Sequence, residues 1–165
     1  MSATVLHTAR PAPAGAWVDA APFRAHLKHL MAVSHLSSSA VAMLAGVSPR
    51  LAYRLLHGHG GRPLRRVSPD IARKLLQVTA AEARAVRVRP VPAARTRTNL
   101  RKLQAAGWAL PDLALAVGLP ESQIEELLSR RERSCTQQVA LRAAAEVSLL
   151  LLPLPREGRS ERHAA

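Results

Sequence analysis

The sequence predicts an all-α protein made of two similar helical units in tandem, and three observations support this prediction. One local pattern occurs at 38–57 and again at 110–129. Leucines before the two copies match at a constant separation, since Leu27 and Leu30 precede Leu100 and Leu103 by 73 residues (100 − 27 = 103 − 30 = 73). Apolar residues recur at helical spacing throughout both copies. Each copy spans about 60 residues, which is enough for a small core.

The elements of the first unit follow from this periodicity. Residues 1–18 are rich in Ala and Pro and are expected to be a disordered tail. A helix over 20–33 would bury the stripe of Phe23, Leu27, Leu30 and Met31. The Ser-Pro pairs at 48–49 and 68–69 each suit a helix start, with serine as N-cap and proline in the first turn. The first unit is therefore expected to span 19–85.

The repeated pattern itself predicts two short helices that cross around a tight turn. Ala42 and Ala114 are small enough for the second helix to approach closely, and four residues later Gly46 and Gly118 accept the positive φ of the turn. This spacing is typical of a helix-turn-helix, whose second helix usually enters the DNA major groove.

The remaining segments complete the plan. Residues 86–97 contain Pro90, Pro92 and several arginines, so we expect an extended basic linker here. The second unit would span 98–152, with a final helix over about 136–151. Residues 153–165 are expected to be a second disordered tail.

Composition points to a polyanionic partner. The chain has 24 Lys and Arg against 11 Asp and Glu, a net charge of +13, and only four aromatic residues with which to stack single-stranded bases. Double-stranded DNA is therefore favoured over single strands. One cysteine excludes an internal disulfide, and neither a signal peptide nor a membrane span is evident, so we expect a cytoplasmic, nucleoid-associated protein and no membrane partner.

These residues resemble a known group. Ala106-Gly107-Trp108, Leu113-Ala114 and Gly118-Leu119 match the repressor-like helix-turn-helix domain of phage repressors and Cro-type regulators, and Val67-Ser68-Pro69 fits more loosely. The tandem arrangement is similar to small two-unit helix-turn-helix proteins of actinobacteria and their phages. The resemblance covers about residues 23–150. It implies two four-to-five-helix units and DNA binding, but not which gene is regulated.

The candidate DNA contacts form three sets. Arg50 and Arg54 share one face of the first recognition helix, 49–57, and suit guanine or phosphate contacts. The predicted contacts of the first unit are Ser48, Pro49, Arg50, Tyr53, Arg54 and His57. A second basic set lies in the following loop (Arg62, Arg65, Arg66) and in the linker (Arg87, Arg89, Arg95, Arg97). In the second unit the candidates are Ser122, Gln123, Arg130 and Arg131.

The second unit leaves two interpretations open. Its equivalent helix carries Glu121, Glu125 and Glu126, and phosphates would repel these carboxylates. The unit either makes a weak or shifted DNA contact, or serves for dimerisation or for binding a regulatory protein. A dimer through the apolar end at 149–152 is one such alternative.

No set of residues predicts catalysis. The histidines lack a Glu or Cys at ligand spacing, and no phosphate-binding loop or nucleophile set is present, so the sequence predicts no enzyme, cofactor or metal. We expect a sequence-specific transcriptional regulator that binds double-stranded DNA. The alternatives are an adaptor that docks through the acidic helix, and a nucleoid-type binder without sequence preference.

Overall fold

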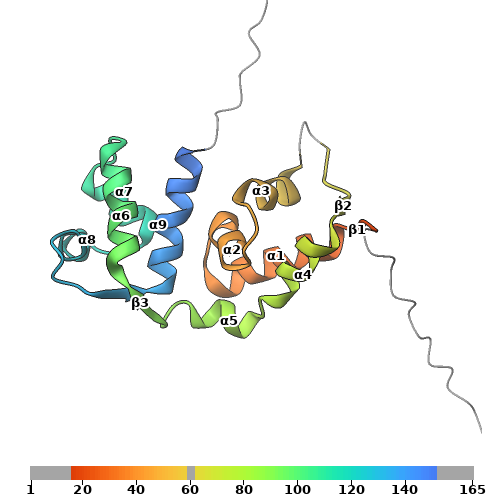
Figure 1. Cartoon of the computed structure of the whole chain (residues 1–165), viewed down its shortest axis with the longest axis horizontal. Helices are drawn as coiled ribbons and strands as arrows, with labels where there is room; N and C mark the ends of the chain where they lie inside the picture. The colour runs from red at the N-terminus through yellow and green to blue at the C-terminus, as the bar shows by residue number, and fades with distance from the viewer. Residues whose placement is uncertain (1–15, 59–61, 152–165) are drawn as a thin grey trace, which may run out of the picture.

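The computed structural model describes residues 16–58 and 62–151, and most of them are helical (Figure 1). This confirms the all-α prediction at the level of helix content. Two small two-stranded sheets accompany the helices. The tail predicted at 153–165 lies outside the described residues. Of the tail predicted at 1–18 only the last three residues are described, and Val18 belongs to a strand.

The elements occur in two runs of the same order, which we call the N-terminal and C-terminal units. The N-terminal unit consists of β1 (Val18–Asp19), α1 (Ala21–Ser34), α2 (Ser38–Leu44), α3 (Pro49–His57), β2 (Arg66–Val67), α4 (Pro69–Gln77) and α5 (Ala80–Ala85). The C-terminal unit consists of β3 (Pro90–Pro92), α6 (Ala93–Ala105), α7 (Leu110–Val117), α8 (Glu121–Leu128), β4 (Ser134–Thr136) and α9 (Gln137–Leu150). The short helix α5 has no separate counterpart among the C-terminal residues described, up to 151.

Each unit is closed by an antiparallel strand pair that the sequence pattern does not predict. Val18 pairs with Val67 in the β1–β2 sheet, and Val91 pairs with Cys135 in the β3–β4 sheet. The backbone N–H that follows each first strand makes a matching bond, from Ala20 to the Arg65 carbonyl and from Ala93 to the Arg133 carbonyl, at 2.9 Å in both cases. The pairing fixes where the first helix of each unit begins.

The prediction of an extended linker over 86–97 is wrong in its extent. Helix α6 begins at Ala93, so the second half of this segment is helical and belongs to the C-terminal unit. Pro90 and Pro92 themselves lie in β3 and not in a helix, and Pro92 occupies the N-cap of α6, where a missing N–H costs no helical hydrogen bond. Both prolines are tolerated in β3 because the sheet has only two strands.

The predicted cores are largely confirmed. Phe23, Leu27 and Leu30 are buried in the N-terminal core, and Leu100 and Leu103 are buried at the matching places in the C-terminal core. In α4 Leu75 is fully buried, Ile71 is half-buried and Leu76 is exposed. None of the helices in the described part of the chain is long and apolar enough to cross a membrane.

Helix α9 lies between the two units (Figure 1). Val139, Ala143 and Val147 belong to the C-terminal core, whereas Ala145 belongs to the N-terminal core. The Arg142 guanidinium donates to the carbonyls of Val117, at 3.2 Å, and of His35, at 2.8 Å, and so bonds to both units. The two units are therefore packed against each other through a shared helix.

Candidate nucleic-acid interface

The turn between α2 and α3 has the geometry that its sequence predicts. Gly46 has φ 67°, and beyond it the Val47 N–H donates to the Ala42 carbonyl at 2.9 Å. The Ser48 hydroxyl accepts from the Leu51 N–H at 3.2 Å and caps α3. The α7–α8 turn repeats the glycine and the backbone bond, with Gly118 at φ 73° and the Leu119 N–H donating to the Ala114 carbonyl at 3.1 Å, but its N-cap is Pro120, which makes no side-chain cap.

The outward face of α3 holds four of the predicted contact residues. Arg50, Tyr53, Arg54 and His57 stand three, four and seven residues apart, so they share one face, and all four are exposed. The rings of Tyr53 and His57 lie against each other with centroids 4.6 Å apart. The opposite face of α3 is buried through Ala52 and Leu55. Of the other two predicted residues, Ser48 is exposed at the N-cap and Pro49 is half-buried.

The arginines of α3 have no carboxylate partner among the described residues. In that part of the chain, ion pairs form only between Asp70 and its neighbours Arg73 and Lys74. The positive charge on α3 is therefore not neutralised within the described structure, and an incoming polyanion would meet it directly.

The loop after α3 brings further arginines to the end of this helix. Gly58 has φ 78°, and a side chain there would meet the backbone carbonyl of Arg62, so the chain turns back closely. Arg62, Arg65 and Arg66 are all exposed. A hollow of about 200 Å³ at this point is lined by Arg54, Gly58, Arg62, Pro63, Leu64 and Arg65. Three predicted arginines therefore surround one small hollow, an arrangement that suits a phosphate group.

The four arginines predicted in the segment 86–97 do not lie together as one group with the arginines of α3 and its loop. Arg87 is exposed, and the exposed Arg89 donates to the Gln137 side-chain oxygen at 3.3 Å. Arg95 and Arg97 lie on α6. Arg97 donates to the carbonyls of Leu127, at 2.6 Å, and Glu132, at 2.8 Å, which ties α6 to the end of α8. This half-buried guanidinium has a structural role.

Sequence reasoning missed the counterpart of Arg97 in the N-terminal unit. Arg24 donates to the carbonyls of Leu55, at 2.7 Å, and Leu64, at 2.8 Å. Arg24 and Arg97 are 73 residues apart, the same separation as the repeated leucines. We call these two side chains the arginine clamps, since each holds the end of the second helix of its turn against the first helix of its unit. The repeated Arg-x-x-Leu spacing was the signal that could have identified them.

The exposed face of α8 differs from that of α3 at every matching position. With a separation of 72 residues, Ser122, Glu125, Glu126 and Ser129 stand where α3 has Arg50, Tyr53, Arg54 and His57, and all four are exposed. Gln123 is exposed as well. Arg130 and Arg131 follow α8 on an exposed loop, and Arg130 has φ 65° where the N-terminal unit has a glycine.

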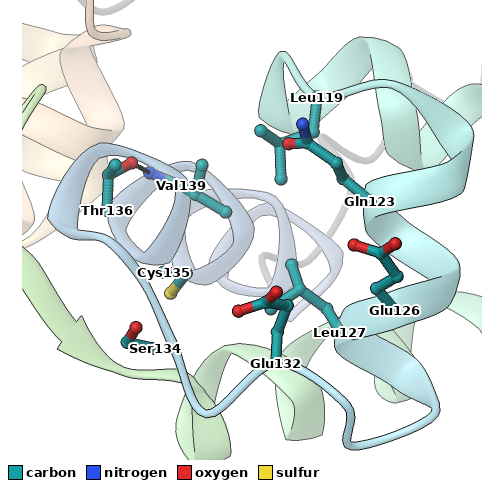
Figure 2. A pocket seen from close by; sticks show the side chains of 9 residues that line it. All are labelled: Leu119, Gln123, Glu126, Leu127, Glu132, Ser134, Cys135, Thr136 and Val139. Atoms are coloured by element: carbon teal, nitrogen blue, oxygen red, sulfur yellow. Dashed lines mark hydrogen bonds between the residues drawn. The ribbon is translucent and has the colours of Figure 1, made fainter.

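A hollow of about 300 Å³ lies beside α8 (Figure 2). The Glu126 and Glu132 side chains both line it, and the half-buried Cys135 thiol lies 3.3 Å from the Thr96 hydroxyl. Its lining comprises Leu119, Gln123, Glu126, Leu127, Glu132, Ser134, Cys135, Thr136 and Val139. Nowhere in the described chain do three His, Cys, Asp or Glu side chains gather into a metal site. The exposed face of α8 is acidic, and a hollow lies beside it.

The N-terminal unit explains why this hollow exists. Gln123 matches Leu51 at the separation of 72 residues. After the shorter loop of the C-terminal unit the separation is 68, so that Glu132 matches Leu64 and Val139 matches Ile71. These three apolar residues all pack against the N-terminal core. Polar or smaller side chains at these three places leave the space unfilled.

Comparison of the chain with models of known families, with characterised proteins and with solved structures finds no match.

Proposed function

We propose that this protein binds double-stranded DNA and acts as a sequence-specific transcriptional regulator, with α3 as its main recognition helix. The single observation that supports this most is the outward face of α3, where Arg50 and Arg54 are exposed and form no ion pair with any described residue. We interpret α2–α3 and α7–α8 as helix-turn-helix pairs. In such a pair the second helix enters the major groove.

The chemistry of the side chains suits this role. An arginine can donate two hydrogen bonds to guanine O6 and N7, worth about 1–3 kcal/mol of discrimination. Ser48 at the N-cap offers a hydroxyl, which already accepts one bond and can still donate its proton to a phosphate. The hollow formed by Arg54, Arg62 and Arg65 would hold another phosphate beside the end of α3.

A second candidate function rests on α8. Its exposed Glu121, Glu125 and Glu126 favour a basic protein surface over a phosphate backbone. In this alternative the C-terminal unit is an adaptor, or the contact surface of a dimer, while the N-terminal unit binds DNA. Leu149, Leu150 and Leu151 remain exposed at the end of α9, as the proposed apolar dimer contact requires.

The test is binding to a pool of random-sequence duplexes, measured by fluorescence anisotropy over a range of salt concentrations, with sequencing of the retained DNA. We expect affinity to fall steeply with salt because phosphate contacts release counterions. We also expect one enriched motif. A steep salt dependence without enrichment would instead indicate a nucleoid-type binder, and no binding at physiological salt would contradict the proposal.

Two variants locate the contact. Arg50→Ala should weaken binding to the enriched motif about tenfold or more while changing binding to random duplexes much less. Arg73→Ala is the matched control, because Arg73 is an exposed arginine on α4 that is already paired with Asp70. Equal losses for both variants on both kinds of DNA would contradict α3 as the recognition helix.

A further inference from the structure

A third hollow lies where the two units meet. It measures about 510 Å³ and is bounded by α2 of the N-terminal unit and by β3, α6 and α9 of the C-terminal unit. Its walls are mostly apolar and include Met43, Pro92, Ala140, Leu141 and Ala144. We call this hollow the inter-unit cleft. Its volume falls within the roughly 300–1,000 Å³ of small-molecule sites, which are commonly apolar and lie between packed units.

One nearly buried polar side chain in the inter-unit cleft has no hydrogen-bond partner in the described part of the chain. Asn99 of α6 is only 8% exposed, and no hydrogen bond to its side-chain amide forms among the described residues. No fully inaccessible side-chain nitrogen or oxygen in that part of the chain lacks a partner, so this amide keeps some accessible surface, and Asn99 lines the cleft. A nearly buried amide without hydrogen bonds is costly, and a ligand in the cleft would satisfy it.

The cleft also has a single charge. Arg95, one turn before Asn99 on α6, is the only charged residue in its lining, and it is exposed with no ion pair among the described residues. Gln137 contributes a second amide, whose oxygen already accepts from Arg89. A guanidinium and an unpaired amide one turn apart on a helix that lines an apolar hollow are complementary to a carboxylate attached to a hydrocarbon body.

We propose that the inter-unit cleft binds a small organic anion with an apolar body, such as an aromatic or aliphatic carboxylic acid. Arg95 pairs with the carboxylate, and the Asn99 amide donates a hydrogen bond to it. The apolar body lies against Met43 and Leu141, which belong to helices that meet at the boundary between the units. This site is separate from the exposed face of α3, and its existence does not depend on DNA binding.

The probe is 4-phenylbutyrate, titrated into the isotopically labelled full chain and followed by NMR of the side-chain and backbone amides, without DNA. We expect saturable shifts of the Asn99 side-chain amide together with the backbone amides of the cleft. The neutral analogue 4-phenylbutanol should bind about tenfold more weakly, because it cannot pair with Arg95.

Three variants test the residues. Arg95→Met keeps the hydrocarbon stem and should weaken phenylbutyrate binding about tenfold, whereas Arg131→Met removes the same charge from an exposed loop away from the cleft and should leave binding unchanged. Asn99→Leu should weaken binding and raise the Tm, since it removes an unsatisfied amide. A purely structural asparagine would lower the Tm when it is replaced.

Three results would overturn the proposal. The first is an absence of saturable shifts at Asn99 up to about 10 mM probe, a concentration at which even a weak specific site fills. The second is equal binding of the acid and the alcohol, and the third is an equal effect of Arg95→Met and Arg131→Met, which would indicate attraction to the overall positive charge only.

Discussion

Helices α3 and α8 occupy equivalent places in two units with the same order of elements, yet their outward faces have opposite charge. Arg50 and Arg54 give α3 two positive charges, whereas Glu125 and Glu126 give α8 two negative charges. The scaffold beneath them shares individual hydrogen bonds, since Arg24 and Arg97 clamp the two helix ends at nearly equal distances.

The difference teaches that the fold and the binding surface depend on separate residues. Buried positions such as Leu55 and Leu127, and the arginine clamps, maintain the helix pair. Exposed positions are free to change without cost to that arrangement, because they contact solvent. A repeat of the scaffold is therefore not evidence that the second copy binds the same partner.

The largest effect should come from exchanging the two faces. Arg50→Ser with Arg54→Glu gives α3 the character of α8, and we expect DNA affinity to fall about a hundredfold or more, since two arginine contacts worth about 1–3 kcal/mol each are lost. The reciprocal pair, Ser122→Arg with Glu126→Arg, should tighten binding and steepen its salt dependence if α8 lies near the duplex. Anisotropy titrations at several salt concentrations measure both. No change in affinity from either exchange would mean that neither helix meets DNA.

The arginine clamps provide the next largest effect, and here the units should behave alike. Arg24→Met and Arg97→Met each remove two hydrogen bonds from a half-buried guanidinium to carbonyls. We expect the free energy of unfolding to fall by about 2 kcal/mol in each variant, as measured by chemical denaturation. The exposed Arg87→Met is the control and should change it by less than about 0.5 kcal/mol. If Arg97→Met has the same free energy of unfolding as the wild type, Arg97 has no structural role and is again a candidate DNA contact.

Replacing the turn glycine should cost more stability in the C-terminal unit than in the N-terminal unit. Gly46→Ala meets no atom within 4 Å, so only the positive φ costs stability, about 1 kcal/mol. A side chain at Gly118 would also displace the Arg142 guanidinium, which bonds to both units, and we expect Gly118→Ala to cost about 2 kcal/mol.

A double-mutant cycle with Arg142→Met checks this reason for the glycine difference. In the Arg142→Met background Gly118→Ala should cost about 1 kcal/mol, the same as Gly46→Ala. If the additional cost of Gly118→Ala persists there, displacement of Arg142 is not its cause.

The smallest effect concerns the pH dependence of α9. Burial raises the pKa of Glu146 above its ordinary value of 4.5, and the matching position of the N-terminal unit holds the buried Val78. The free energy of unfolding therefore falls as the pH rises from 4.5 through this raised pKa, because the folded protein must then bury a charge. Glu146→Gln should be more stable than wild type at neutral pH and equally stable in acid. A stability difference that is independent of pH would show that charge burial is not responsible.

Much of the fold could be predicted because local patterns determine it. The Ser-Pro helix starts, the paired glycines and the repeated leucines place the main helices to within a few residues. The exposed face of α3 was predicted in full for the same reason, since spacings of three and four residues fix a helical face. The structure of the linker segment was not predicted correctly, because β3 has only three residues and pairs with a strand more than 40 residues away. No local pattern encodes such a contact.

The arginine clamps and the inter-unit cleft were missed for a related physical reason. An arginine on a basic protein is indistinguishable by sequence from a DNA contact until the carbonyls that it meets are known. The cleft forms between segments as distant as Met43 and Ala144, and its unpaired Asn99 is an ordinary helix residue in the sequence. One signal was available for α9, since Ala140, Leu141, Ala143, Ala144 and Ala145 leave it apolar on more than one side, as expected of a helix packed between two surfaces.

The sharing of α9 has a consequence for cooperativity. A chain cut after residue 85 would keep every helix of the N-terminal unit but would uncover the surface of α2 that α9 protects. Because α9 packs against both units, we expect the two repeats to unfold as one thermodynamic domain and each repeat to be less stable without the other. We therefore expect a single unfolding transition in calorimetry, with the calorimetric and van't Hoff enthalpies equal.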